Sequence, residues 1–99
     1  MQLDIENYPP RVQADFHIIK GHYHYAFDHP KEMYYHRKKA LTIIEDLKWE
    51  MRIWLTHARF LVIGLSTFKM FEEFDRELEH IIDVINKIPI QKRHPGFIE

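Results

Sequence analysis

The sequence predicts an α+β fold in which an N-terminal β-hairpin is followed by a long helix and an antiparallel second helix. Apolar and polar residues alternate over residues 12–27, apolar residues then recur every three or four positions, and a second such stretch ends at Pro89. With 99 residues, 45% of them hydrophobic, the chain can build one core. We expect an arm over residues 1–11, one domain over residues 12–88 and a tail over residues 89–99.

The hairpin is predicted around Lys20-Gly21. Glycine accepts the positive φ that a two-residue hairpin loop requires. The apolar face of the two strands would consist of Ala14, Phe16, Ile18, Tyr23, Tyr25 and Phe27. On the opposite face His17 would lie across from His24.

Two helices are predicted after Pro30, which suits the first turn of a helix because its missing N–H has no partner there. The first has roughly 35 residues and a length of about 50 Å, and Gly64 is its expected end. Its inner face consists of positions three or four apart: Met33, Arg37, Ala40, Ile44, Leu47, Met51, Trp54, Ala58, Leu61 and Leu65. The second helix runs from Phe68 to Ile88.

The long helix carries a second apolar stripe, nearly opposite the first: Trp49, Ile53, Phe60 and Ile63. A helix that is apolar on two sides is covered on two sides, here by the hairpin or by another chain. Because twofold homodimers are the commonest assembly, we expect a homodimer with these four residues at its interface.

Composition excludes several classes of function. Lys and Arg number 14 against 15 Asp and Glu, so the net charge of −1 gives no general attraction to nucleic acid or to acidic membranes. The absence of cysteine removes disulfides, iron–sulfur clusters and thiolate zinc sites. The longest apolar run, residues 60–65, is too short for a membrane span. We expect a soluble, intracellular protein.

Isoleucine is abundant, with 13 residues, whereas the chain has one serine and two asparagines. Scarce amides and thiols with abundant charge are typical of proteins that work at high temperature. In composition the chain resembles small proteins of filamentous viruses that infect hot-spring archaea. The resemblance implies a viral origin and carries no functional residue.

Five of the eight histidines lie between His17 and His36. On the predicted hairpin His17, His22 and His24 share one face with Asp15, and three imidazoles with one carboxylate suit zinc, iron or manganese. The alternative is that these rings fill half-exposed strand positions. The main prediction has no metal, no cofactor and no catalytic residue.

An enzymatic alternative comes from His22-Tyr23-His24 followed by Tyr35-x-x-Lys38. This order resembles rolling-circle replication initiators and related nickases. The resemblance implies that His22 and His24 hold a divalent metal, that Tyr35 attacks a DNA phosphate and that Lys38 faces it. That family builds its site on about five strands, and only two are predicted here.

A nucleic-acid-binding alternative comes from Arg37, Lys38 and Lys39, which follow two tyrosines and could contact phosphates and stack on bases. The competing interpretation is a solvated helix start. Glu77 and His80 have the Glu-x-x-His spacing of di-iron bundles, but the helical pattern places them on a solvated face.

The sequence contains no glycine-rich phosphate loop and no convincing nucleophile–base pair. We therefore expect a small non-enzymatic interaction or regulatory module that is homodimeric and binds an unknown protein partner. The alternatives are the histidine-dependent nickase and the nucleic-acid binder.

Overall fold

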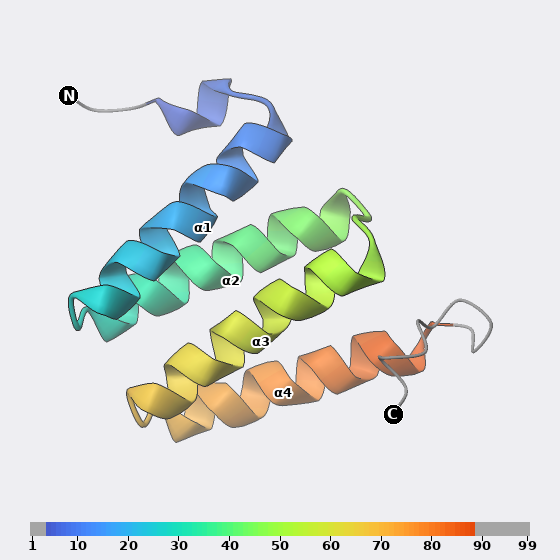
Figure 1. Cartoon of the computed structure of the whole chain (residues 1–99). Coiled ribbons are helices and arrows are strands. Elements are labelled where there is room, and N and C mark those ends of the chain that lie inside the picture. The colour runs from blue at the N-terminus through green and yellow to red at the C-terminus, as the bar shows by residue number, and fades with distance from the viewer. Residues whose placement is uncertain (1–3, 89–99) are drawn as a thin grey trace.

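The computed structural model describes residues 4–88, and over this range the chain is entirely helical. A 3₁₀ turn, η1 (Ile5–Asn7), precedes four helices of 16 or 17 residues each. These are α1 (Pro10–Ala26), α2 (Pro30–Asp46), α3 (Met51–Thr67) and α4 (Phe71–Asn86). They run alternately in opposite directions in a four-helix bundle-like arrangement (Figure 1). The α+β prediction is therefore wrong, and the predicted tail, residues 89–99, lies outside the described range.

The predicted hairpin is α1. The same residues that alternate with period two also contain a helical pattern, because Ala14, His17 and Gly21 are three and four positions apart and all three are buried. Pro10 is the first residue of the helix rather than the end of the arm, and proline at this position loses no hydrogen bond. His17 and His24 therefore do not face each other across a strand pair.

The predicted long helix is two helices, α2 and α3, separated by a turn over residues 47–50. The inner face was nevertheless placed correctly on both sides of this turn. Of its ten predicted positions, all are buried except Leu47, in the turn, and Met51, directly after it. Gly64 does not end the helix and lies inside α3.

Each of the three turns between helices contains one non-glycine residue with a positive φ: Asp28 at 59°, Lys48 at 54° and Lys69 at 58°. The backbone N–H that follows each of them bonds back to a carbonyl five residues earlier, as Met70 N does to Leu65 O at 2.8 Å. This is the hydrogen bond of a Schellman motif, in which glycine is the usual residue at the left-handed position.

We expect Lys69→Gly to raise the free energy of unfolding by about 0.5–1 kcal/mol, because Lys69 is exposed and glycine adopts φ near +60° without steric cost. Urea denaturation would measure this gain. Ser66→Gly, inside the exposed last turn of α3, is the matched control and should be destabilising by about the same amount. A loss of stability in both variants would contradict the role assigned to the turn.

Each helix packs mainly on its neighbours in sequence, and the most extensive contact is between α1 and α2. The molecule measures 47 × 33 × 19 Å, so it is about two helices thick. The largest fully buried side chains come from α2 and α3: Met33, Leu41, Ile44, Leu61 and Leu65. The core therefore lies around α2 and α3.

Polar side chains join α4 to α2. Glu77 is only 2% exposed and accepts hydrogen bonds from the Tyr34 hydroxyl and the Lys38 ammonium, both at 2.7 Å. Nearby, Glu45 Oε1 accepts from His80 Nε2 and from Trp54 Nε1, both at 3.0 Å. The prediction that Glu77 lies on a solvated face is wrong, because its carboxylate is buried and bonds α4 to α2.

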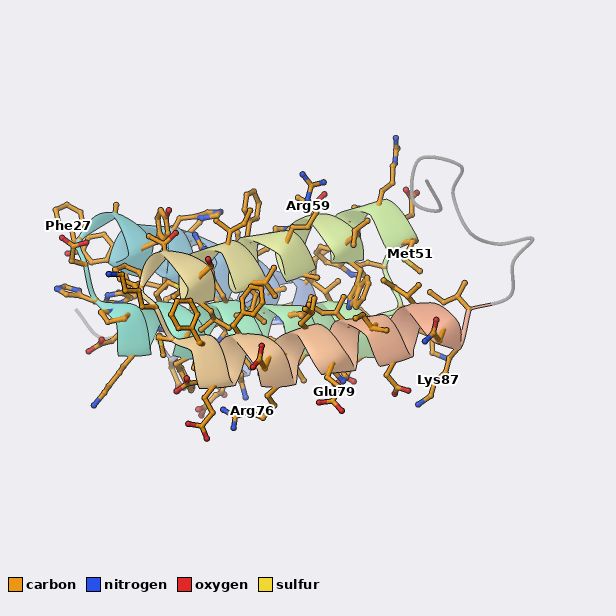
Figure 2. The ribbon with its side chains drawn as sticks, turned by 90° about the horizontal axis from the view of Figure 1, so that it is seen from below. Phe27, Met51, Arg59, Arg76, Glu79 and Lys87 are labelled. Carbon is orange, nitrogen blue, oxygen red and sulfur yellow. The ribbon has the colours of Figure 1, made fainter. Side chains whose placement is uncertain are left out.

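The outer side of α4 is charged, and Figure 2 shows Arg76, Glu79 and Lys87 directed away from the bundle. Within residues 4–88, no helix combines the length and the apolar character that crossing a bilayer requires.

Candidate functional site

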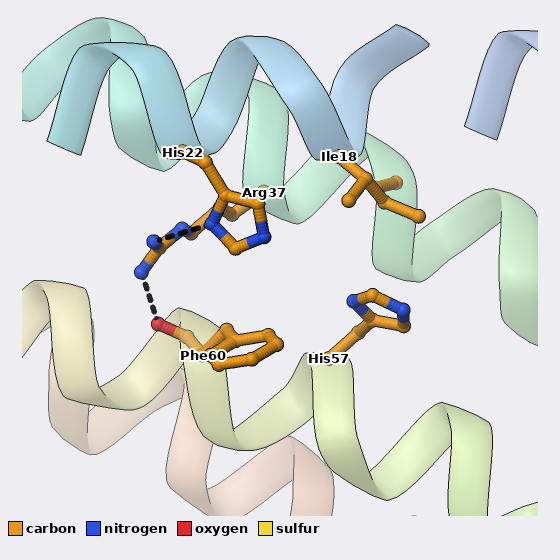
Figure 3. Close-up of a pocket in the computed structure, with 6 residues that line it drawn as sticks. Ile18, His22, Arg37, His57 and Phe60 are labelled. Carbon is orange, nitrogen blue, oxygen red and sulfur yellow. Dashed lines mark hydrogen bonds between the residues drawn. The ribbon is translucent and has the colours of Figure 1, made fainter. Parts of the chain in front are cut away.

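A narrow groove lies between α1 and α3, and α2 forms its floor (Figure 3). Ile18 and His22 reach into it from α1, and His57 and Phe60 reach into it from α3. The side chain of Arg37 crosses from the floor between these two walls. This groove brings a buried cation, two imidazoles and an aromatic ring into one place.

Arg37 is 7% exposed. Its Nη1 donates to the backbone carbonyl of Phe60 at 2.5 Å, and its Nη2 donates to Nδ1 of His22 at 3.1 Å. The guanidinium carbon lies 4.7 Å from the centre of the Tyr25 ring and 5.8 Å from that of Phe60. Through these contacts Arg37 joins α2 to both α1 and α3.

Two glycines make room for this side chain. A Cβ atom on Gly21 would lie 2.7 Å from Cγ of Arg37, and a Cβ on Gly64 would lie 2.8 Å from Nη1 of Arg37 and 2.6 Å from Sδ of Met33. None of these three distances is compatible with an unchanged packing. The glycine on each wall is therefore required by the arginine between them.

The guanidinium has no carboxylate partner among residues 4–88, because none of the ion pairs found there includes Arg37. Its Nε is buried and makes no hydrogen bond within the described structure. Burial lowers the pKa of Arg37, and the neighbouring Tyr25 opposes this shift. An arginine nevertheless keeps its proton, so the groove holds an uncompensated positive charge.

The hydrogen bond to Arg37 fixes the tautomer of His22. A guanidinium only donates, so Nδ1 of His22 must accept and the ring proton must be on Nε2. Burial and the charge of Arg37 lower the pKa of His22, which keeps the ring neutral at pH 7. Burial also lowers the pKa of His57, with contributions from His22 and Arg37, while Asp15 opposes the shift.

The groove contains two compartments, which share His22, Arg37 and Phe60 as lining residues. The inner one, between His22 and His57, has a volume of about 10 Å³, which is enough for a single water molecule. The outer one has a volume of about 290 Å³ and is lined by His22, Tyr25, Phe60 and Ile63 in addition to Arg37. The outer compartment is open and large enough for a small charged group.

A second cluster of polar residues, which we call the histidine cluster, lies between α1 and α2 and consists of His17, His24, His29 and His36. Nδ1 of His17 lies 2.8 Å from Nδ1 of His36, so one ring must donate and the other accept. The His36 ring stacks on that of His24 at 5.4 Å, and Nδ1 of His24 lies 3.0 Å from Nδ1 of His29. In each of these two pairs at least one ring must be neutral, because an imidazolium has no acceptor nitrogen.

Electrostatics in the histidine cluster favour the neutral form. Burial lowers the pKa of His36 to about 4, with further contributions from His17, His24 and Lys20, while Glu32 opposes the shift. The pKa values of His17 and His24 are lowered as well, in both cases mainly by burial. Over residues 4–88, no three His, Asp or Glu side chains are arranged to hold one metal ion.

The metal alternative required His17, His22, His24 and Asp15 to share one face of a hairpin, and in the structure these residues belong to helix α1. His17 and His24 face α2, whereas His22 contacts Arg37. Asp15 is exposed on α1. The four residues therefore do not converge on one point, although all three histidines contact residues of α2.

The residues predicted for the nickase and for nucleic-acid binding also lie in different surroundings. Tyr35 is 58% exposed, and Lys38 is paired with the buried Glu77. Lys39 and Lys38 line an open depression of about 430 Å³ on α2, together with Lys31, Tyr34, Tyr35 and Thr42. Arg37 points to the opposite side of the helix, into the core, so the predicted basic cluster is not one surface.

Three of the four predicted interface residues are exposed on α3: Ile53 at 37%, Phe60 at 36% and Ile63 at 49%. The fourth, Trp49, lies in the turn before α3 and is partly covered, with the guanidinium of Arg11 4.9 Å from its ring centre. The predicted second stripe of α3 is thus largely on the surface, and α1 reaches it at Phe60, whose ring contacts that of His22.

Comparisons with protein-family models, with curated proteins and with solved structures gave no significant match. The function must therefore be argued from the residues of this chain.

The groove itself was not predicted, although one signal for it was present. Arg37 occupies an inner-face position of α2, between Met33 and Ala40, and this position predicts burial. A cation on the buried face of a helix is rare unless it has a role, because an unpaired charge is costly to bury.

Proposed function

We propose that this protein is a small non-enzymatic interaction module that forms a homodimer through the exposed face of α3. This face, the α3 stripe, consists of Ile53, Thr56, Phe60, Ile63 and Thr67. Its residues are spaced three and four apart over about 21 Å of helix. The observation that carries the proposal is the exposure of three large apolar side chains on one neutral face.

The composition of the α3 stripe favours a second copy of this chain as the occupant. It contains no ionisable side chain, so two copies meet without repulsion between like charges. The net charge of −1 adds no long-range repulsion. A partner chosen by charge would need charged residues on this face.

The symmetry of the α3 stripe supports an antiparallel pairing of two α3 helices. Phe60 lies midway between Ile53 and Thr67. In a twofold dimer the same patch is present on both subunits, so the residue at its centre lies near the axis. An aromatic residue in that position is typical of the centre of an interface.

We expect sedimentation equilibrium to give a dimer for the wild type and a monomer for the double variant Ile53→Glu, Ile63→Glu, because four carboxylates would be buried in the dimer. Ile82→Glu is the matched control, since Ile82 is also 49% exposed but lies on α4. It should remain dimeric.

Helical circular dichroism would show whether the variants keep their fold. A monomeric wild type at about 100 μM, or a double variant that still dimerises, would contradict the proposal.

A further inference from the structure

We propose that the groove between α1 and α3 binds a small oxyanion, a carboxylate or phosphate group of a ligand, against the guanidinium of Arg37. This site borders the α3 stripe, since Phe60 and Ile63 belong to both. Its evidence is separate, because it is the environment of one buried charge.

The guanidinium of Arg37 has no counterion among residues 4–88. A charge taken out of water is stabilised by an opposite charge or by a full set of hydrogen bonds, and Arg37 has neither among residues 4–88. Its two acceptors, the Phe60 carbonyl and the His22 imidazole, are neutral. An oxyanion supplies the charge that the protein does not.

Arg37 keeps N–H donors that are not used by the contacts within residues 4–88. A guanidinium has five N–H groups, and the two bonds to Phe60 and His22 use two of them. Arg37 lines both compartments of the groove. The Nε2–H of His22 is also without a partner among the described residues of this groove, because Nδ1 of the same ring accepts from Arg37, and it lies on the side of the ring that faces Ile18 and His57 (Figure 3).

The outer compartment is large enough for such a group. Its volume of about 290 Å³ exceeds that of a carboxylate or phosphate group, and Tyr25, Phe60 and Ile63 give it apolar walls. These walls reduce the contact of a bound group with water on their side, and charge-assisted bonds are stronger where water is less abundant. The one carboxylate near the groove, Asp15, acts on His57 and has no contact with Arg37.

Burying Arg37 requires glycine at two helical positions, and glycine destabilises a helix. Gly21 in α1 and Gly64 in α3 have a lower helix propensity than other residues would have, and they leave the space that Arg37 occupies. A buried side chain whose only task was to fill the space would not need to be charged.

The test is thermal unfolding of the full chain in sodium phosphate, sodium acetate and sodium chloride at equal ionic strength, at pH 7. We expect phosphate or acetate to raise the melting temperature relative to chloride by about 5 °C at tenfold above its dissociation constant. The anion with the larger effect identifies the oxyanion. Arg37→Met should abolish the difference, whereas Arg59→Met, which removes an exposed arginine from α3, should retain it.

A second measurement avoids any variant at Arg37. In a titration of ¹⁵N-labelled wild type with the more effective anion, the amide signals of Gly21 and Gly64 should shift with one saturable constant, because both residues contact Arg37. Equal melting temperatures in the three salts, or shifts confined to surface lysines, would overturn the proposal. A monomeric wild type that still binds the anion would leave this site standing without the dimer.

Discussion

Gly64→Val is expected to lower the free energy of unfolding by about 3 kcal/mol or more. Valine has a better helix propensity than glycine by a few tenths of a kcal/mol, so propensity alone predicts a small gain. The first added carbon, however, would lie 2.6 Å from Sδ of Met33 and 2.8 Å from Nη1 of Arg37. Overpacking in a filled core costs about 1–3 kcal/mol, and the displaced arginine loses its hydrogen bond to Phe60 in addition.

Urea denaturation of wild type and variant would measure this loss. Ser66→Val is the matched control, because it introduces the same side chain at an exposed position of the same helix and should change stability by less than about 0.5 kcal/mol. If Gly64→Val were as stable as the control, the packing of Arg37 between the two glycines would be wrong.

Acidification from pH 7 to pH 5 is expected to lower the free energy of unfolding by about 2 kcal/mol through the histidine cluster. In the folded protein the pKa of His36 is about 4, below the value of 6.5 in the unfolded chain. As the pH falls below 6.5, His36 becomes protonated in the unfolded chain but stays neutral in the folded protein. The free energy of unfolding therefore decreases until the pH reaches about 4. His17 and His24, whose pKa values are also lowered, act in the same direction.

Denaturation with urea at pH 7, 6 and 5 would measure this dependence, and the range stays above the pKa of ordinary carboxylates. His36→Gln removes the contribution of His36 and should make the profile less steep, while its amide can still bond to His17. The remaining slope comes from the other histidines whose pKa values are lowered. His80→Gln is a suitable control, since His80 is outside the cluster and contacts Glu45. A profile as steep in His36→Gln as in the wild type would contradict this account.

The fold was predicted in part, and the errors have a common cause in the use of glycine. Gly21 was interpreted as a hairpin turn and Gly64 as a helix end, because glycine usually marks turns. Here both glycines are inside helices and contact Arg37. The turns are at Asp28, Lys48 and Lys69, which adopt the left-handed conformation without being glycine. Nothing in the local composition distinguishes these three from other polar residues.

The hairpin was predicted from a true alternation that is compatible with two structures. On each side of Lys20-Gly21 every second residue is apolar or aromatic, which is typical of a strand, but a helix can bury positions 14, 17 and 21 of the same segment. Histidine and glycine at two of these positions concealed the helical pattern. Tertiary packing on α2, which the segment alone does not encode, decided between the two.

Parts of the candidate surfaces could be predicted because they depend only on helical spacing. The exposed Ile53, Phe60 and Ile63 and the buried position of Arg37 follow from the period of α2 and α3. The pairing of His17 with His36 and of Arg37 with His22 could not be predicted, because each pair joins two helices whose relative position depends on an unrecognised turn.

The packing of each helix on its successor also bears on how the chain reaches its native state. Contacts between neighbours in sequence close only short loops, so little chain entropy is lost before the first contacts form. Topologies of this kind fold within microseconds to milliseconds. The bonds from Glu77 to Tyr34 and Lys38 join segments about forty positions apart, and we expect them to form late, after α2, α3 and α4 have docked in order.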